Sequence, residues 1–240
     1  MKIMTALLSL SLVTCAGGHV PPVLAPYHHG DIIINNVASP GRHDPVYKSV
    51  VRVIDRKNGS TGTAFVFKNI KGHSYILTAQ HICLRRGRKL ETTSVPDENN
   101  ETETFFVKTV YTNKEDDVCI ARMYDTGHRF LPLSFATERP RTGDRVMMIG
   151  ASEGVFPTKT DGYVIGHDLL GNDGSSDENT YAKKLLVSAG SANGNSGGPV
   201  YNERFELVGM LVANHPEFHH SSLCTHLEAI RYHLKKYFKR

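Results

Sequence analysis

Short segments in which apolar and polar residues alternate dominate the chain from residue 46 onward. Alternation runs from Val46 to Ile54, and the turn pairs Asn58-Gly59 and Lys71-Gly72 separate the strand-like segments that follow. Further strands are predicted at 63–67, 74–78, 105–111, 118–123, 145–149, 162–166, 183–188 and 207–213. Because no long helical pattern lies between them, the sequence indicates an all-β fold of barrels or sandwiches.

Two polar stretches interrupt this pattern. Residues 85–104 are basic over 85–89 and acidic over 97–103, and residues 167–180 are rich in Asp, Asn, Gly and Ser. We interpret residues 85–104 as a polar excursion between strands, with the basic cluster as a solvated surface loop, and residues 167–180 as a loop.

The end of the chain has a helical period. Leu227, Ile230, Leu234 and Tyr237 recur every three or four residues, which predicts a C-terminal helix over 227–240 with one apolar face. We expect that face to dock on the domain. Because the other faces are basic, the alternatives are a helix that lies on a membrane surface or one that contacts a polyanion.

The first residues have the pattern of a cleavable signal peptide, assigned to 1–16. Lys2 precedes a mostly apolar run over 3–13, and small residues follow at 14–18. The run is shorter than the roughly 20 apolar residues that cross a bilayer, and a buried helix is the alternative. Residues 12–15 also resemble a lipobox, in which Cys15 becomes lipidated. We therefore expect a secreted or periplasmic protein, held at a membrane only if Cys15 carries lipid.

Composition adds few constraints to the 240-residue chain. A net charge of +4 is too small to predict a nucleic-acid partner. If cleavage of the signal peptide removes Cys15, the odd number of three cysteines remains, Cys83, Cys119 and Cys224, and the sequence does not decide which of them pair. Residues 17–45 are rich in Pro, His, Gly and Asn and predict an extended arm. The adjacent histidines of the chain lack further ligands at metal-binding spacing, so we expect no metal site.

Residues 194–199 (Gly-Asn-Ser-Gly-Gly-Pro) carry the strongest chemical signal. A serine hydroxyl becomes a useful nucleophile when a neighbouring base removes its proton. Glycines around Ser196 allow positive φ and close approach of a substrate. The N–H groups of Gly194 and Ser196 can then converge on one oxygen, as an oxyanion hole requires.

This hexapeptide resembles the Gly-Asp/Asn-Ser-Gly-Gly-Pro motif of the chymotrypsin-like serine proteases, which implies that Ser196 is the nucleophile. Residues 75–81 (Tyr-Ile-Leu-Thr-Ala-Gln-His) resemble the family's Leu-Thr-Ala-Ala-His motif and imply that His81 is the general base. Residues 62–66 resemble the Gly-Ser-Gly-Phe strand of bacterial and viral members. Residues 117–123 resemble the Asp-Ile-Ala-Leu-Leu-Lys-Val pattern, which makes Asp117 the triad carboxylate and Asp116 its exposed neighbour. The order His, Asp, Ser is also that of the family.

The resemblance covers residues 46–235 and implies two six-stranded antiparallel β-barrels. The N-terminal barrel over 46–130 would hold His81 and Asp117, and the C-terminal barrel over 131–226 would hold Ser196. The implied activity is that of a serine endopeptidase, which needs no cofactor and cleaves protein or peptide substrates through an acyl-enzyme. A protease-like fold kept as a catalytically silent binding module is the alternative.

Departures from the digestive branch of the family narrow the placement. No cysteine lies on the strand at 62–67, so that branch's usual disulfide beside His81 is missing. Asn195 replaces the aspartate that pairs with a newly cut N-terminus, which speaks against activation by that route. The chain is most similar to HtrA-type, glutamyl-endopeptidase and viral members, without a PDZ module after residue 240.

The register of the resemblance also places the primary substrate pocket. Its floor is expected near Gly190 and Ser191, and Val212, Ala213 and Asn214 would form one wall. No aspartate lies six residues before Ser196, so cleavage after Lys or Arg is not expected. A small or medium apolar residue is the expected preference, and His215 or His226 are candidates for recognising an acidic side chain.

Overall fold

The computed structural model describes residues 44–55, 60–83, 87–97, 100–127, 129–169, 183–215 and 220–239. The predicted signal peptide, Cys15 and the predicted arm up to residue 43 lie outside the described residues.

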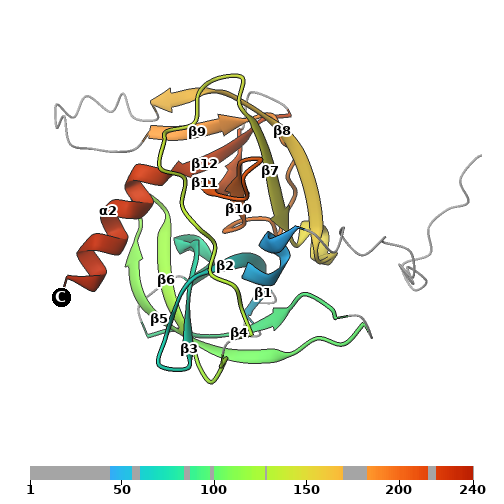
Figure 1. Ribbon diagram of the computed structural model, residues 1–240, viewed down its shortest axis with the longest axis vertical. Coiled ribbons are helices and arrows are strands. Elements are labelled where there is room, and N and C mark those ends of the chain that lie inside the picture. Colours follow the sequence, from blue (N-terminus) through green and yellow to red (C-terminus); the bar gives the residue numbers. More distant parts are fainter. Residues whose placement is uncertain are drawn as a thin grey trace, which may run out of the picture. The chain divides into compact units, whose positions relative to one another are not determined.

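The described strands form two closed six-stranded barrels, which confirms the predicted fold class (Figure 1). The first barrel has the order β1-β2-β3-β6-β5-β4, and each neighbouring pair is antiparallel. A 3-10 helix, η1 (Pro45–Ser49), precedes β1, and a one-turn helix, α1 (Gln80–Cys83), follows β3. The strands of the first barrel are β1 (Val50–Asp55), β2 (Ser60–Ile70), β3 (His73–Ala79), β4 (Lys89–Ser94), β5 (Thr104–Asn113) and β6 (Val118–Met123).

The second barrel repeats this architecture in the order β10-β11-β12-β9-β8-β7, again with antiparallel neighbours. A short 3-10 segment, η2 (Ser152–Gly154), follows β7. The strands are β7 (Arg145–Gly150), β8 (Thr158–Leu169), β9 (Lys183–Val187), β10 (Pro199–Tyr201), β11 (Leu207–Asn214) and β12 (Ser222–His226).

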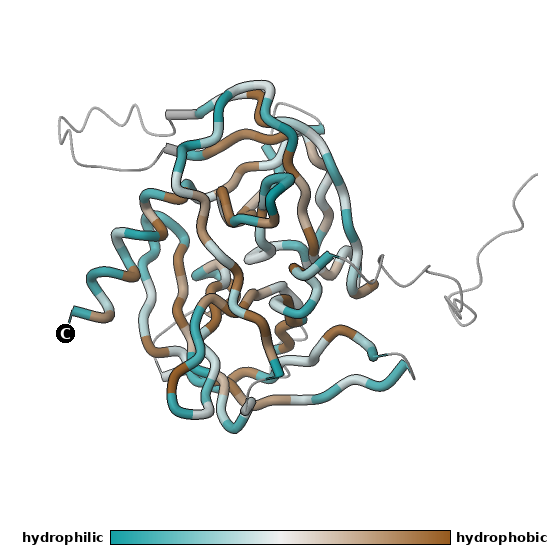
Figure 2. Tube along the Cα trace, viewed as in Figure 1, coloured by the Kyte–Doolittle hydropathy of each residue, from teal (hydrophilic) through white to brown (hydrophobic). Residues whose placement is uncertain are grey.

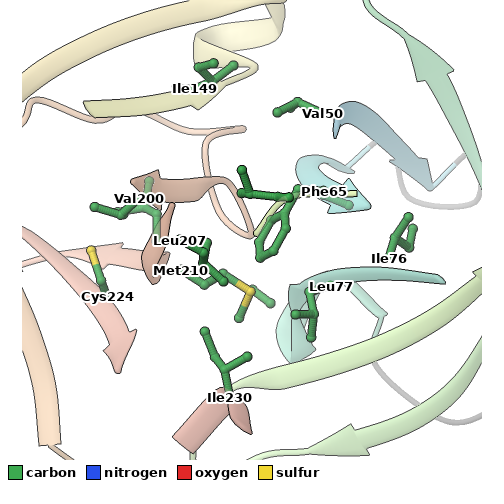
Figure 3. Packing of buried hydrophobic residues seen from close by; sticks show 14 of the residues in the cluster. Val50, Phe65, Ile76, Leu77, Ile149, Val200, Leu207, Met210, Cys224 and Ile230 are labelled. Atoms are coloured by element: carbon green, nitrogen blue, oxygen red, sulfur yellow. The ribbon is translucent and has the colours of Figure 1, made fainter. Parts of the chain in front are cut away.

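Apolar side chains make up the buried core, as the alternation in the sequence requires. Figure 2 shows hydrophobic and hydrophilic positions following one another along the strands. Phe65 and Leu77 are fully buried in the first barrel, and Val200 and Leu207 are fully buried in the second (Figure 3). Full burial of each such side chain contributes about 1.5–3 kcal/mol. The two cores are continuous through one cluster of buried residues, so the barrels pack against each other along an apolar contact.

The C-terminal helix α2 (Leu227–Phe238) docks on the barrels by its apolar face, as predicted. Leu227 and Ile230 are buried, and Figure 3 shows Ile230 among the core side chains. The rings of Tyr237 and Phe238 lie against Tyr75 on β3 of the first barrel. The helix therefore begins at the end of β12 and returns to the first barrel (Figure 1). Within the described part of the chain, no helix has the length and apolar character needed to span a bilayer.

The polar excursion over residues 85–104 contains a strand that the sequence pattern did not predict. Strand β4 lies within this stretch and pairs with both β1 and β5, which closes the first barrel. Leu90 and Thr92 point inward and are buried, and the polar threonine hides the alternation in the sequence. Arg88, from the basic cluster, forms an ion pair with Asp55, which is almost fully buried.

Candidate active site

The first barrel brings His81 and Asp117 together through the pairing of β3 with β6. Ala79 at the end of β3 is opposite Val118 at the start of β6, so the residues just beyond both strands are neighbours. His81 lies in helix α1, and Asp117 is the residue before β6. The Gln80 N–H donates to the Asp117 carbonyl at 3.0 Å, which ties the two segments together.

The Asp117 carboxylate accepts two hydrogen bonds from the same histidine. Its Oδ2 atom lies 2.7 Å from Nδ1 of the His81 ring, and its Oδ1 atom accepts from the His81 backbone N–H at 2.9 Å. Burial alone would raise the pKa of Asp117, but these hydrogen bonds and the charges of His81 and Lys184 lower it below the ordinary value. The carboxylate is therefore ionised at neutral pH and holds the ring by Nδ1, which leaves Nε2 available as a base.

A disulfide joins the two segments that carry this pair. Cys83 lies two residues after His81, Cys119 lies two residues after Asp117, and their sulfur atoms are bonded. Both cysteines are fully buried, whereas Cys224 is a buried free thiol. The sequence left this pairing open because cysteine spacing alone does not determine which residues meet in space.

Ser196 lies on a loop over residues 193–198, and carbonyl groups of this loop accept hydrogen bonds from residues outside it. The carbonyls of Asn193, Gly194 and Ser196 accept, respectively, from the Glu153 N–H at 2.7 Å, the Thr63 hydroxyl at 2.8 Å and the Thr63 N–H at 2.8 Å. Among the described residues, neither the Gly194 nor the Ser196 N–H has a hydrogen-bond acceptor. Two free donors two residues apart on a loop held by its carbonyl groups can serve as an oxyanion hole.

Gly194 is required at its position for two reasons. Its φ of +91° lies in the region that favours glycine, and a Cβ atom there would overlap the carbonyl oxygen of Ala151. Gly197 has a φ of +86° and packs equally closely against Thr63 and Thr78 of the first barrel. Gly194 therefore allows the loop to lie against the segment that follows β7, and Gly197 allows it to lie directly on the first barrel.

Asn195 takes part in a neutral network. Its side chain is nearly fully buried, and its Oδ1 atom accepts from the Ser152 hydroxyl at 3.0 Å. The Ser152 hydroxyl is also 2.7 Å from the hydroxyl of Thr158, which donates to the Gly150 carbonyl. Neutral hydrogen bonds from the β7–β8 connection thus fix the loop at the position where the digestive branch uses an ion pair.

Ser196 and the predicted pocket residues lie around strand β11. The Ser196 hydroxyl donates to the Val212 carbonyl at 3.3 Å, and no hydrogen bond to His81 occurs among the described residues. Ser191 donates to the Asn214 side chain and lies 2.8 Å from the hydroxyl of Ser222, a residue of β12 that sequence reasoning missed. Gly190 lies on the same segment, where its carbonyl accepts from Thr160, and Ala213 is exposed beside Val212. The structure therefore brings Ser191 and Asn214 into direct contact.

Asp116 is not the exposed neighbour that the sequence predicted. It is only 7% exposed, and its Oδ2 atom lies 2.6 Å from Nε2 of His233 on α2. Its carbonyl accepts from the side chains of Thr225 and Lys184 in the second barrel. The sequence pattern predicted an exposed Asp116 because the residues that bind it come from distant segments of the chain.

His226, a candidate for recognising an acidic substrate, has another environment. It is 4% exposed and stacks on His167, with their ring nitrogens 3.2 Å apart. Arg139 donates to the His226 ring at 3.2 Å, which places a cation where a metal bound by the two rings would lie. Among the described residues, no three His, Cys, Asp or Glu side chains form a metal-binding group. Interactions within the protein therefore occupy the His226 ring.

Sequence reasoning also missed Thr63, which is fully buried on β2. Its hydroxyl donates to the Gly194 carbonyl and accepts from the Ala151 N–H at 3.0 Å, so it joins two loops of the second barrel. The sequence did carry one signal, because Thr63 lies at the serine position of the Gly-Ser-Gly-Phe pattern.

Known proteins share this fold and parts of the sequence. Residues 62–210 match the family model described as a trypsin-like peptidase domain. A probable periplasmic serine protease, do/HhoA-like, from Haemophilus influenzae is 28% identical over 153 residues, which cover 63% of this chain but 30% of that protein.

Solved structures agree in fold. An inactive form of Rv3671c from Mycobacterium tuberculosis, with its serine replaced by alanine, has a TM-score of 0.65 at 19% identity and covers 81% of this chain and 88% of its own. A serine endoprotease from Yersinia pestis has a TM-score of 0.63 at 18% identity, over 82% and 66% of the two chains. The match to the family model extends over more than half of this sequence, and its fold is the two-barrel architecture of these enzymes. The chain belongs to the trypsin-like peptidase family.

Proposed function

We propose that this protein is a serine endopeptidase in which Ser196 is the nucleophile, His81 the general acid–base and Asp117 the residue that orients His81. The observation that carries this proposal is the double hydrogen bond from His81 to the Asp117 carboxylate. It fixes one tautomer of the ring and directs the lone pair to Nε2. The Ser196 loop, with its free N–H donors, supports the same assignment.

In the first half-reaction, the Ser196 hydroxyl leaves the Val212 carbonyl and turns toward His81. As Oγ attacks the peptide carbonyl carbon, its proton passes to Nε2 of His81. The negative oxygen of the tetrahedral intermediate receives hydrogen bonds from the Gly194 and Ser196 N–H groups. Cleavage of the C–N bond then transfers the Nε2 proton to the leaving amine and leaves an acyl group on Ser196.

Water completes the cycle. His81 takes a proton from the water molecule as its oxygen attacks the acyl carbon, and it returns that proton to Ser196 Oγ when the ester bond breaks. Asp117 stays ionised throughout and stabilises the imidazolium that forms twice in each turnover.

Labelling with a fluorophosphonate probe tests the nucleophile. The wild-type protein should react at one site, Ser196→Ala should not react, and His81→Ala should react far more slowly. A folded wild-type protein that stays unlabelled, or labelling that survives Ser196→Ala, contradicts the proposal. If a broad peptide library also stays uncut by the folded protein, the binding-module alternative is favoured.

The proposed primary pocket combines the predicted residues with Ser222. The hydrogen bonds among Ser191, Asn214 and Ser222 give this part of the site a polar but uncharged character. We therefore expect small or medium uncharged residues before the cleaved bond, in preference to Lys or Arg. Profiling of cleavage sites in a peptide library tests this expectation, and a dominant preference for basic residues would contradict it.

Location outside the cytoplasm is part of the proposal. It rests on the signal-like pattern over residues 1–16 and on the similarity to a periplasmic protease. Fractionation of cells that express the full chain, followed by N-terminal sequencing of the product, tests it. Recovery of the uncleaved chain in the cytoplasm would contradict it.

A further inference from the structure

Lys184 on β9 is a buried cation near the proposed catalytic pair. It is 8% exposed, and its Nζ atom donates to the Asp116 carbonyl and to the Thr225 hydroxyl, both at 3.3 Å. Among the described residues, no carboxylate lies within ion-pair distance of Nζ. Burial of an ammonium is unfavourable unless hydrogen bonds and nearby negative charges compensate for it, so the position of Lys184 calls for an explanation.

Asp116, whose carbonyl accepts from Lys184, forms hydrogen bonds through its N–H, its carbonyl and its carboxylate. Its N–H donates to the Asn113 side chain at 2.8 Å, and its carbonyl accepts from Thr225 at 2.6 Å as well as from Lys184. Its carboxylate pairs with His233 of α2 at 2.6 Å. One residue of the first barrel is therefore fixed by β9, β12 and α2.

Fixing Asp116 also fixes the peptide unit that leads into Asp117. Asp117 has a φ of +55°, a conformation that few residues other than glycine adopt and that surrounding contacts must maintain. In this conformation one carboxylate reaches both the backbone N–H and the ring of His81. Without the contacts to the Asp116 carbonyl, the Asp117 backbone would relax and this double hydrogen bond would weaken.

The charge of Lys184 acts on the same carboxylate. Burial lowers the pKa of Lys184, and the negative charges of Asp117 and Asp116 oppose that effect. In return, Lys184 contributes to the lowered pKa of Asp117. The Cys224 thiol on β12 faces Lys184 too, but burial raises its pKa, so it stays neutral.

Other titratable groups near this cluster are His233 of α2 and Tyr111 of β5, whose hydroxyl lies 2.7 Å from His233 Nδ1. On the neighbouring strand β8, Asp168 is the register partner of Lys184. Lys184 is thus the buried cation that faces the two aspartates from the second barrel.

We propose that Lys184 is a positioning residue, which holds the Asp116–Asp117 turn through the Asp116 carbonyl and places a positive charge behind the proposed triad. This inference rests on the proposed function. It predicts two separable effects of Lys184: its hydrogen bond sets the geometry of Asp117, and its charge favours the ionised form of the Asp117 carboxylate.

The rate of fluorophosphonate labelling, measured from about pH 5 to pH 9, separates these effects because it needs no known substrate. Lys184→Met keeps the length of the side chain but removes its charge and its hydrogen bonds. We expect labelling to slow by about tenfold or more. Because Lys184 contributes to the lowered pKa of Asp117, its removal makes protonation of that carboxylate more favourable, and the acid limb should also move to higher pH.

Two further variants complete the test. Thr225→Val removes one hydroxyl from the Asp116 carbonyl but keeps the charge, so labelling should slow several-fold with the acid limb unmoved. Lys159→Met removes a cation of the same barrel that pairs with Asp44, and it should behave as wild type. A merely structural role of Lys184 would reduce the folded fraction without moving the acid limb.

Each outcome decides between the proposals. A folded Lys184→Met protein with the wild-type rate and pH profile overturns the role of Lys184 and leaves the triad intact. If Lys184→Met does not fold, a wild-type rate for Thr225→Val overturns it instead. A folded wild-type protein that never reacts overturns the proposed function itself.

Discussion

Replacing Thr63 by valine removes one hydroxyl from the contact between the barrels while it nearly keeps the shape of the side chain. The hydroxyl donates to the Gly194 carbonyl at 2.8 Å and accepts from the Ala151 N–H at 3.0 Å. Thr63 is fully buried, so water cannot take the place of either bond without rearrangement. An orphaned buried polar group costs about 1–3 kcal/mol, and two such groups predict a loss of about 2–4 kcal/mol after partial relaxation.

Activity should fall for a related reason. The peptide that contains the Gly194 carbonyl belongs to the loop that aims the Gly194 and Ser196 N–H groups. Loss of one oxyanion donor costs about 100- to 1,000-fold in kcat, and a loosened loop should cost less, about 10- to 100-fold. KM should change little, because these donors act on charge that develops in the transition state.

Kinetics on a cleaved peptide, together with the affinity of a peptide boronate, measure this effect. For Thr63→Val, boronate affinity and kcat should fall in parallel, whereas Thr63→Ser keeps the hydroxyl and should stay near wild type. Thr78→Val is the matched control, since it removes the hydrogen bond to the Thr63 carbonyl and leaves Gly194 and Ala151 paired. Wild-type kcat in folded Thr63→Val, or an equal loss in Thr63→Ser, would refute the reasoning.

Three other predictions concern neighbouring parts of the site. Gly194→Ala should abolish peptide hydrolysis, because the φ of +91° at this position and the neighbouring Ala151 carbonyl exclude a methyl group. Circular dichroism should show that the barrels remain folded, and retained activity would contradict the prediction. Replacing both Cys83 and Cys119 by alanine should lower the free energy of unfolding by about 3–4 kcal/mol, because their disulfide closes a loop with a sequence separation of 36 residues. Urea denaturation measures this loss, and an unchanged midpoint of the unfolding transition would contradict the prediction. Because the pKa of Asp117 is lowered in the folded protein, its carboxylate stabilises the fold above the unfolded pKa of 3.8, and this stabilisation is lost as pH falls through the folded pKa. The difference in the free energy of unfolding between wild type and Asp117→Asn should therefore shrink below about pH 4. A constant difference there would contradict the prediction.

The conformation of the loop around Ser196, the proposed nucleophile, could be anticipated from the sequence because its requirements are local. Glycines beside Ser196 follow from the backbone angles and close contacts of that loop, and both appear within six residues. His81 and Asp117 could be predicted because each lies at the end of an apolar strand, and strand ends are visible in the alternation. The two-barrel fold followed from the same strands and from the resemblance carried by these motifs.

The surroundings of Asp116 could not be predicted in this way. Lys184, Thr225 and His233 lie 68, 109 and 117 residues away along the chain, and no local pattern links them to Asp116. Strand β4 was missed because threonine occupies a core position, and the disulfide was left open because cysteine spacing does not determine contact. In each case the missing information was the three-dimensional pairing of distant segments.

These distant contacts cross between the barrels in both directions. Thr63 of the first barrel holds the loop of Ser196, which belongs to the second barrel. Lys184 and Thr225 of the second barrel hold the residue beside Asp117, which belongs to the first. A shift of one barrel against the other would therefore displace the proposed oxyanion donors and the proposed triad carboxylate together. Because buried hydrogen bonds weaken steeply with misalignment, the site requires the barrels to keep their relative position even where the fold itself would tolerate a small movement.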